Sequence, residues 1–339
     1  MRAGRLMSGL LLVPFLVAVV AVACRASGES RADKLSATDV LGPLPVPLGN
    51  PQTPEKVALG KQLFFDPRLS VNGQLSCSSC HLAEKGLSDG LARPRDHKGE
   101  EGGRNSSSLW NAAYEDFPSW DGRLVSLEQH SGAALRRIAE NVPDVVVRID
   151  TVPGYREQFK AVFGEGINFT NVSRALAAFT RSLLSWRSGH DRFEAGDRRA
   201  LTEEQQLGRK VFFDKGGCAS CHAPPLFTDH RFHNLGVPQV GPVTDDPGRF
   251  GVTGDERERG AFRTPTLRNV ALTAPYMHDG VFATLKEVVA FYEGGGGNVP
   301  GRSPLVQPFT LDARERAALV AYLEALTHEG TKVTPPQLP

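Results

Sequence analysis

CSSCH (77–81) and CASCH (218–222) are the two stretches of this sequence that decide its fold. Each joins a pair of cysteines, separated by two residues, directly to a histidine. The residues before them are also alike, because ALGKQLFFDPRLSVNGQLSCSSCH (58–81) is echoed by QLGRKVFFDKGGCASCH (206–222). Such self-similarity indicates two related modules in one chain.

C-x-x-C-H is the attachment pattern of c-type haem, in which two thiols bond to the haem vinyl groups and the adjacent histidine is held against the iron. A C-x-x-C redox pair or a four-cysteine zinc site would leave both histidines unexplained. The sequence therefore predicts two covalently attached haem c groups. They would be bound through Cys77, Cys80, Cys218 and Cys221, with His81 and His222 as the proximal iron ligands.

Helical periodicity dominates the rest of the chain. LDARERAALVAYLEALT (311–327), for example, places Leu319 and Leu323 on one face, whereas no convincing run of alternating strand residues appears. We therefore predict an all-α fold of two cytochrome c-like domains, each enclosing one haem, with long ordered loops. A polar, glycine-containing stretch before residue 199 sets the boundary between an N-terminal domain, 53–190, and a C-terminal domain, 191–339.

The N-terminal residues, 1–23, have the pattern of an export signal, with two arginines before an apolar run that ends in small residues. AVAC (21–24) is similar to a bacterial lipobox, although Ala21 stands where leucine is usual. Two outcomes stay open, a lipid anchor on Cys24 and release into the periplasm. The stretch 24–52 is rich in Ser, Pro and Gly and is expected to be a tether.

Composition agrees with a folded protein of about two domains. The 339 residues are 40% hydrophobic, which is enough for a substantial core. The formal net charge is only +1, with 39 Lys and Arg against 38 Asp and Glu. Without a concentrated basic face, nucleic acid is excluded as the expected partner.

Beyond the two motifs, RNSSSLWNAAY (104–114), SWDGRLVSLEQ (119–129) and FRTPTLRNVALTAPYMHDGVFATLKEVVAFYEGG (262–295) identify a family. With them the chain resembles the bacterial dihaem cytochrome c peroxidases, which include the MauG-like enzymes. The resemblance covers about residues 53 to 328. It implies an N-terminal haem where peroxide reacts and a C-terminal haem that receives electrons.

The resemblance also implies residues around the first haem. His97, sixteen residues after His81 (97 − 81 = 16), matches the loop histidine that covers the peroxidatic iron at rest and leaves when the other haem is reduced. Glu140 matches the catalytic glutamate, which moves a proton between the peroxide oxygens. His130 falls where the family has glutamine, and a shift of one residue would place Gln129 there instead. Without the resemblance, His97 and Glu140 would be taken as surface residues.

Trp120 matches the tryptophan that the family places between the two haems, where an aromatic ring would shorten the electron path. Trp110, in contrast, is expected to pack in the core. Asn105, together with the backbone oxygens of Thr273 and Pro275, matches a structural calcium site between the domains.

The sixth ligand of the second haem has two candidates. Met277, in APYMHDG (274–280), is the last of three methionines, and His/Met coordination would raise the reduction potential. In the family, however, the axial ligand follows the landmark His278 by fourteen residues, which leads to Tyr292 (278 + 14 = 292). Peroxidases have methionine there and MauG-like members have tyrosine. We predict Tyr292 as the ligand, with Met277 as the alternative; without the resemblance, Tyr292 would be a packed helix aromatic.

These residues predict a periplasmic dihaem peroxidase that reduces hydrogen peroxide with electrons from a small redox protein, such as a monohaem cytochrome or a copper protein. One alternative is a MauG-like oxidase that acts on a protein or organic substrate through high-valent iron, which Tyr292 favours. The other is a non-enzymatic dihaem electron carrier, in which Glu140 would be incidental. The resemblance also implies a homodimer.

Overall fold

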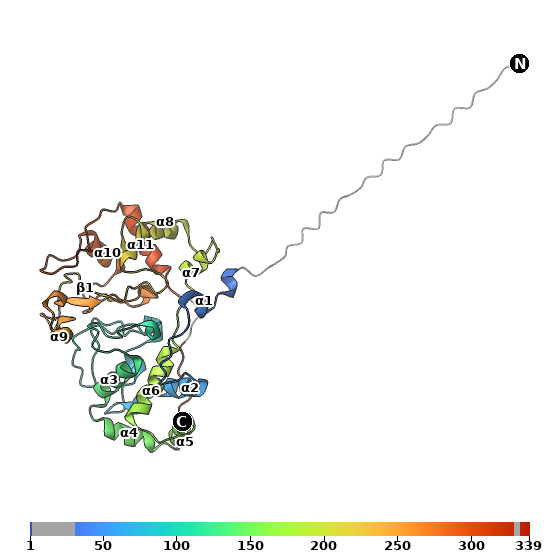
Figure 1. Cartoon of the computed structure of the whole chain (residues 1–339), viewed down its shortest axis with the longest axis vertical. Coiled ribbons are helices and arrows are strands. Elements are labelled where there is room, and N and C mark those ends of the chain that lie inside the picture. Colours follow the sequence, from blue (N-terminus) through green and yellow to red (C-terminus); the bar gives the residue numbers. More distant parts are fainter. Residues whose placement is uncertain (2–30, 329–332) are drawn as a thin grey trace.

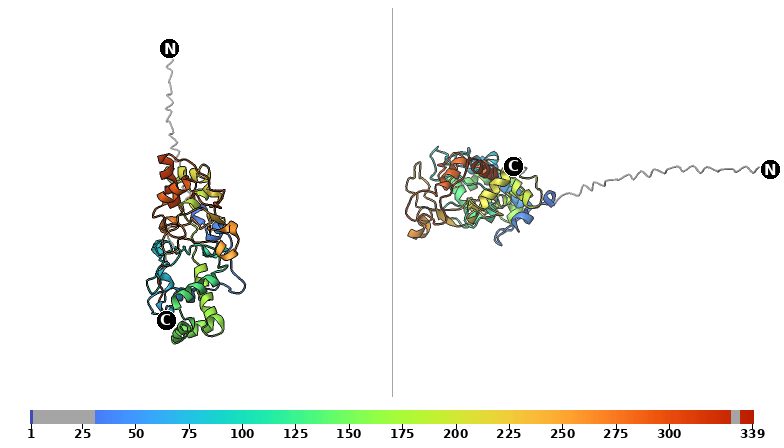
Figure 2. Two further views of the ribbon diagram at one scale, coloured as in Figure 1. Left: turned by 90° about the vertical axis from the view of Figure 1, so that its left-hand side faces the viewer. Right: turned by 90° about the horizontal axis from the view of Figure 1, so that it is seen from above.

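The computed structural model describes Met1 and residues 31–328 and 333–339. Nearly all of the predicted signal peptide, and Cys24, lie outside these residues. Within the described ranges, no helix combines the length and the apolar character needed to cross a bilayer. The helices gather in two groups, with α2 to α6 at one end of the molecule and α7, α8, α10 and α11 at the other (Figure 1). The left-hand view of Figure 2 shows the same two groups from the side.

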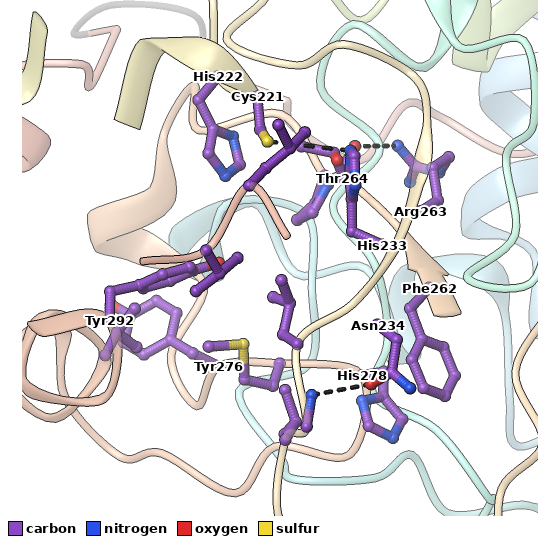
Figure 3. Close-up of a pocket in the computed structure, with 18 of the residues that line it drawn as sticks. Cys221, His222, His233, Asn234, Phe262, Arg263, Thr264, Tyr276, His278 and Tyr292 are labelled. Carbon is purple, nitrogen blue, oxygen red and sulfur yellow. Dashed lines mark hydrogen bonds between the residues drawn. The ribbon is translucent and has the colours of Figure 1, made fainter. Parts of the chain in front are cut away.

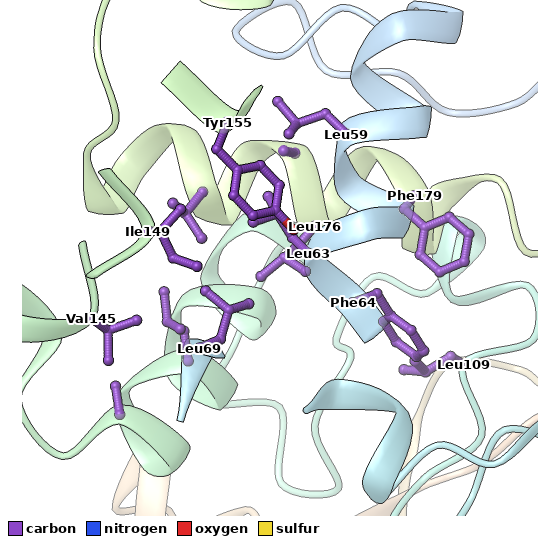
Figure 4. Close-up of a cluster of buried hydrophobic side chains, with 14 of the residues drawn as sticks. Leu59, Leu63, Phe64, Leu69, Leu109, Val145, Ile149, Tyr155, Leu176 and Phe179 are labelled. Carbon is purple, nitrogen blue, oxygen red and sulfur yellow. The ribbon is translucent and has the colours of Figure 1, made fainter. Parts of the chain in front are cut away.

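The N-terminal group is built around two packed helices. α2 (Pro54–Phe65) begins after Thr53, whose hydroxyl caps it by accepting from the Lys56 N–H. It crosses α6 (Phe169–Arg181) so closely that a β-carbon on Gly60 would collide with the carbonyl oxygen of Ala175. The remaining helices of this group are α3 (Leu127–Ala139), α4 (Val142–Asp150) and α5 (Pro153–Phe163). Leu59, Leu63, Phe64, Tyr155, Leu176 and Phe179 belong to the core between them (Figure 4).

The C-terminal group repeats this arrangement. α8 (Glu203–Phe213) crosses α11 (Ala313–Glu324), and a β-carbon on Gly208 would collide with the carbonyl oxygen of Ala318. Phe212 packs edge-to-face on Tyr322, with the ring centroids 5.3 Å apart, as Phe64 does on Phe179 at 5.1 Å. The remaining helices are α7 (Gly189–Glu194), α9 (Phe250–Thr253) and α10 (Leu285–Glu293). The prediction of two related, helix-dominated modules is confirmed.

One short ribbon is the only sheet among the described residues. β1 (Phe232–Asn234) pairs antiparallel with β2 (Ala261–Arg263), so that His233 lies opposite Phe262. The ribbon closes the base of the long loop between its strands. This loop carries α9 and a 3₁₀ turn, Glu256–Glu258, which agrees with the predicted ordered loops. Further 3₁₀ turns are Pro67–Leu69, Cys77–Ser79, Ala83–Lys85, Ala112–Tyr114, Cys218–Ser220 and Val270–Leu272.

Both described ends of the chain lie against the body. Before α2 the chain forms a 3₁₀ turn, Arg31–Lys34, and α1 (Ala37–Leu41). The carbonyl oxygens of Leu35 and Gly42 accept hydrogen bonds from Trp186 at 3.5 Å and from Tyr114 at 3.1 Å. From residue 31 on, the expected tether is therefore in contact with the folded domains. The last residues, 333–339, lie near α5 (Figure 1), and the carbonyl of Pro339 accepts from Arg68 at 3.2 Å.

Candidate haem centres

The two proximal histidines are held in the same way. Nδ1 of His81 donates to the carbonyl oxygen of Leu87 at 2.8 Å, and Nδ1 of His222 to that of Phe227 at 2.9 Å. Each bond fixes the tautomer that leaves Nε2 free for a metal ion. Burial also lowers the pKa of both imidazoles, which favours the neutral form that binds iron. Both sites therefore fit the proximal side of a haem.

Leu87 and Phe227, which orient these histidines, were missed in the sequence. Both side chains are fully buried, and both backbones are left-handed, with φ of 60° and 56°. A non-glycine residue adopts this conformation only at a cost, on the order of 1–2 kcal/mol. The signal that could have found them is the internal repeat, since Leu87-Ser88-Asp89 and Phe227-Thr228-Asp229 stand at nearly the same distance after each motif.

Within the described residues, the four cysteines of the motifs form no disulfide. Burial raises the pKa of Cys77 and of Cys218 to about 12. A catalytic C-x-x-C redox pair instead needs a lowered thiol pKa. Among the described residues, the group of side chains that could hold a metal ion consists of Cys221, Asp229 and His233. Cys77 and Cys80 do not belong to this group, which argues against a four-cysteine zinc site.

A cavity of about 630 Å³ opens beside the second motif. Cys218, Cys221 and His222 line it together with apolar residues from α10 and α11. Figure 3 shows His222 and Cys221 above the space and Tyr292 and Tyr276 below it. An apolar cavity with two thiols and an available imidazole nitrogen at its wall fits a covalently attached haem.

Both candidates for the sixth ligand reach this cavity. Tyr292, on α10, lines it, and burial raises the pKa of its phenol, as do the nearby Cys218 and Cys221. Met277 lines it as well, from a left-handed backbone with φ of 74°. His278, the landmark of the motif, stacks on Phe262 with the centroids 3.6 Å apart, and its Nε2 is buried without a hydrogen-bond partner in the structure.

His130 and Gln129, both on α3, lie in different environments. Burial, followed by the charges of His81 and Arg263, lowers the pKa of His130 to about 4. His130 is therefore close enough to the proximal histidine to interact with it electrostatically. Gln129 is exposed, and its side-chain oxygen accepts from the backbone N–H of Val125 at 3.0 Å, at the start of the helix.

His97 and Glu140 are brought into contact with each other. Nε2 of His97 lies 3.1 Å from Oε1 of Glu140, and Lys98 reaches the same oxygen at 2.5 Å. The side chain of Glu140 is 43% exposed, and the hydrogen bond from Lys98 lowers its pKa. Nδ1 of His97 is buried and has no hydrogen-bond partner in the structure. Glu140 thus forms an ion pair with Lys98 and contacts the loop histidine through the same oxygen.

Trp120 lies between the two motifs. Its ring lines the cavity of His222, and its indole N–H donates to the backbone carbonyl of Asn105 at 3.0 Å. The next residue, Ser106, donates from its hydroxyl to the carbonyl of Cys80 at 3.0 Å. A short chain of bonds therefore joins the first motif to an aromatic ring at the second cavity. Trp110, by contrast, is buried in the N-terminal core, as predicted.

Asn105 also approaches the predicted calcium ligands. Its side-chain amide lies 2.8 Å from the carbonyl oxygen of Leu91 and 3.4 Å from those of Ala92 and Pro275. Several uncharged oxygens thus converge on one side chain, the type of ligand that Ca²⁺ accepts. For Thr273, the contact that the structure shows is local, from its hydroxyl to the carbonyl of Val270 at 3.0 Å.

Arg104, which was not singled out in the sequence, connects the two halves. It ion-pairs with Asp121 at 2.6 Å and donates two hydrogen bonds of 2.7 Å to Asp246. Burial alone would raise the pKa of both carboxyls, but the hydrogen bonds from Arg104 hold both pKa values below their usual range. Its guanidinium also lies 5.4 Å from the ring centroid of Phe262, on which His278 stacks.

Comparisons with known proteins agree with this geometry. Residues 54–199 match the family model described as di-haem cytochrome c peroxidase, and residues 205–327 match the model of cytochrome c. The chain is 39% identical to the cytochrome-c peroxidase IdrP1 of Denitromonas iodatirespirans, over 92% of each chain. It is 40% identical to the methylamine utilization protein MauG of Methylorubrum extorquens, over 87% of this chain and 85% of that protein.

A solved structure supports the same assignment. A MauG-like protein associated with microbial copper homeostasis aligns with a TM-score of 0.78 at 35% identity, covering 85% of this chain and 93% of that one. The chain is therefore an oxidoreductase of the di-haem cytochrome c peroxidase family, built from two cytochrome c-like domains that carry one c-type haem each.

Proposed function

We propose that this protein reduces hydrogen peroxide to water in the periplasm, with electrons from a small redox protein. The observation that supports the proposal is the contact between His97 and Glu140, 3.1 Å apart, because it joins the two residues that the family resemblance assigns to the peroxide side. Two electrons and two protons convert each peroxide molecule into two water molecules. The bound haems would store these electrons and act on the O–O bond.

Electrons would enter at the His222 side, from a monohaem cytochrome or a copper protein. Trp120 lines that cavity and connects through the carbonyl of Asn105 and the hydroxyl of Ser106 to the carbonyl of Cys80. This route supports the role of Trp120 between the two centres, because aromatic rings and hydrogen bonds shorten the through-space steps. It would deliver electrons to the His81 side.

Proton handling would fall to His130 and Glu140. His130 has a pKa of about 4, lowered first by burial, so it is neutral near pH 7 and can accept a proton from peroxide. Glu140 is held by His97 and Lys98. We propose that His97 covers the iron in the resting state and moves away on reduction, which frees the Glu140 carboxylate to take part.

Asn105, Pro275 and Thr273 would hold a structural calcium ion between the domains. The convergence of neutral oxygens on the Asn105 amide supports this part of the proposal. The domain limits 53–190 and 191–339, the signal peptide 1–23, an anchor at Cys24 and a homodimer are likewise proposed. N-terminal processing, by mass spectrometry of exported protein, and sedimentation of the holoprotein would test them.

A second candidate function is the oxidation of a protein or organic substrate, as in the MauG-like branch. The position of Tyr292 on the wall of the second cavity favours it, because an iron-bound tyrosinate oxygen would stabilise oxidised iron and lower the potential. In this case the small redox protein would be replaced by a substrate that gives up electrons at the same side.

Anaerobic reductive titration of the holoprotein, followed by peroxide, distinguishes these functions. Catalytic consumption of peroxide with a reduced cytochrome supports the peroxidase. A long-lived oxidised spectrum without turnover supports the MauG-like alternative. No response to peroxide in any redox state would contradict both and leave an electron carrier.

A further inference from the structure

A buried ion pair between Arg268 and Asp191 lies in the C-terminal half, where their side chains are 0% and 3% exposed. Two guanidinium nitrogens donate to the two carboxylate oxygens at 2.8 Å each. Ser188 adds its backbone N–H and its hydroxyl to the same carboxylate, at 2.8 and 2.6 Å. Burial alone would raise the pKa of Asp191, but these hydrogen bonds hold that pKa low. None of the proposed catalytic residues uses this pair.

The third donor of Arg268 reaches the loop that follows CASCH. Its Nε donates to the carbonyl of Pro225 at 2.7 Å, and the hydroxyl of Thr266 donates to the carbonyl of Leu226 at 2.6 Å. The next carbonyl along the chain is that of Phe227, which accepts from His222. Two consecutive peptide groups are therefore fixed just before the one that orients the proximal histidine.

The ring of Phe227 is held from the same side. The Arg268 guanidinium lies 5.6 Å from its centroid, and His190 packs edge-to-face on it, with centroids 5.0 Å apart. His190 shares a hydrogen bond of 2.9 Å with the hydroxyl of Tyr322. Helix α7, which carries Asp191 and His190, thus contacts both the backbone support and the side chain of Phe227.

Among the residues that the structure describes, no buried charged pair supports the loop after the first motif in this way. Loop 82–88 is closed by its own backbone, with the Leu82 N–H on the Ser88 carbonyl at 2.9 Å and the Leu87 N–H on the Leu82 carbonyl at 2.8 Å. The hydroxyls of Ser88 and Ser108 add bonds to the carbonyls of Lys85 and Gly86, at 2.8 and 2.7 Å. The repeated modules therefore differ, since a charged pair supports only the second of these two loops.

We propose that Arg268 and Asp191 are positioning residues of the C-terminal haem, which hold the Phe227 carbonyl against His222 and thereby keep the reduction potential of that haem low. The inference rests on the proposed function in one respect, that His222 ligates the iron. A strong hydrogen bond from Nδ1 makes the imidazole a better electron donor and favours ferric iron. Loosening the loop weakens this bond, so the potential rises.

The test is a spectroelectrochemical titration of the holoprotein that resolves the two haems. In Asp191→Asn, Arg268→Gln and Arg268→Lys, the potential of the C-terminal haem is expected to rise, while that of the N-terminal haem stays constant. A tenfold shift of the ferric–ferrous equilibrium corresponds to about 59 mV for one electron. Lysine keeps the charge but loses the planar fork, so Arg268→Lys is expected to behave like the other two.

Thr266→Val provides a milder variant, because it removes one bond to the Leu226 carbonyl and leaves the ion pair intact. It is expected to raise the same potential by a smaller amount, and it keeps the test valid if the other variants fold poorly. Arg181→Lys is the matched control. Arg181 is 3% exposed and pairs with Glu128 at 2.6 Å in the N-terminal half, so its loss should leave the C-terminal haem unchanged.

Two results would overturn the inference. Shifts of opposite sign in Asp191→Asn and Arg268→Gln would show that the net buried charge acts, and not the position of the loop. Unchanged potentials in Arg268→Lys and Thr266→Val would show that neither the ion pair nor the anchoring of this loop influences the haem. A wild-type protein that lacks two covalent haems in a pyridine haemochrome assay, or a His222→Gly variant that keeps its low-spin signal, would contradict the proposed ligation itself.

Discussion

The tautomer of each proximal histidine is set by one residue, whose backbone carbonyl accepts a hydrogen bond from the histidine. Both of these residues have an uncommon, left-handed backbone conformation. Leu87 and Phe227 pair a left-handed φ with a fully buried side chain. Glycine would adopt this φ without strain, but it would leave a cavity in the core. The buried side chain therefore anchors the peptide group that each histidine needs.

The sixth ligand of the second haem gives the first prediction. Tyr292→Phe is expected to abolish the low-spin spectrum of this haem, because phenylalanine offers no oxygen to the iron, whereas Met277→Leu should leave it intact. Electron paramagnetic resonance of the oxidised holoprotein measures this. The reverse pattern would assign the ligand to Met277.

The second prediction concerns the peroxide side. His130→Ala is expected to lower kcat/KM for peroxide by about 10²–10⁴, the usual contribution of a general acid–base. His130→Gln should recover part of the loss, since an amide can donate a hydrogen bond but cannot carry the proton. Gln129→Ala is the control and should stay within a few-fold of wild type, about 0.5 kcal/mol. Loss of activity in the control alone would move the distal role to Gln129.

Local residue patterns could be predicted from the sequence, and contacts between distant residues could not. The haem motifs are complete within five residues each, so their histidines follow directly from the spacing. Arg104 meets Asp121 and Asp246 only after folding, and nothing in its neighbourhood marks it. The exposed contact of Glu140 with Lys98 also joins residues that are far apart in the sequence. Such pairs can be identified only in the folded structure.

At the scale of helices, the glycine that recurs in both repeats explains how closely the two main helices of each module pack. Gly60 and Gly208 occupy equivalent places in the two repeats, and each lies against a carbonyl of the partner helix. The repeat and its helical period were readable in the sequence. The reason for the glycine was not, because the partner helix α6 or α11 lies more than a hundred residues away along the chain.

Gly208→Ala is the third prediction. The added methyl would meet the carbonyl of Ala318 and force α8 and α11 apart, which should destabilise the protein by about 1–3 kcal/mol. Urea unfolding followed by circular dichroism measures this. Gly166→Ala is the matched control, since no atom lies within 4 Å of its built β-carbon. Equal stability of both variants would mean that the helices adjust without cost.

For the whole molecule, Arg104 joins the two halves, and its removal gives the fourth prediction. Arg104→Met removes the buried guanidinium that Asp121 and Asp246 share, and leaves Asp121 with Arg123 and Asp246 with the Gly248 N–H. Stability near pH 7 should therefore fall by about 3 kcal/mol, the lower end of the cost of breaking a buried ion pair. Because the folded pKa values of Asp121 and Asp246 are depressed, this contribution is complete above the unfolded value of about 3.9 and is lost as the pH falls through the folded values.

Urea midpoints of the wild type and of Arg104→Met, measured from neutral to acidic pH, test this sign. The difference between them should be constant near pH 7 and shrink below a pH of about 4. Arg257→Met is a suitable control, because its partner Asp255 is on the surface and its guanidinium side chain is 89% exposed. A difference that grows with acidification would contradict the assignment.

The two described ends of the chain lie at different modules. The 3₁₀ turn Arg31–Lys34 contacts α7 of the C-terminal group, whereas Pro339 contacts Arg68 of the N-terminal group. A protein immobilised on an electrode through residues 333–339 would therefore turn the N-terminal group of helices toward the conductor. Attachment at residue 31 would turn α7 and the C-terminal group toward it, so the choice of linker decides which haem centre exchanges current first.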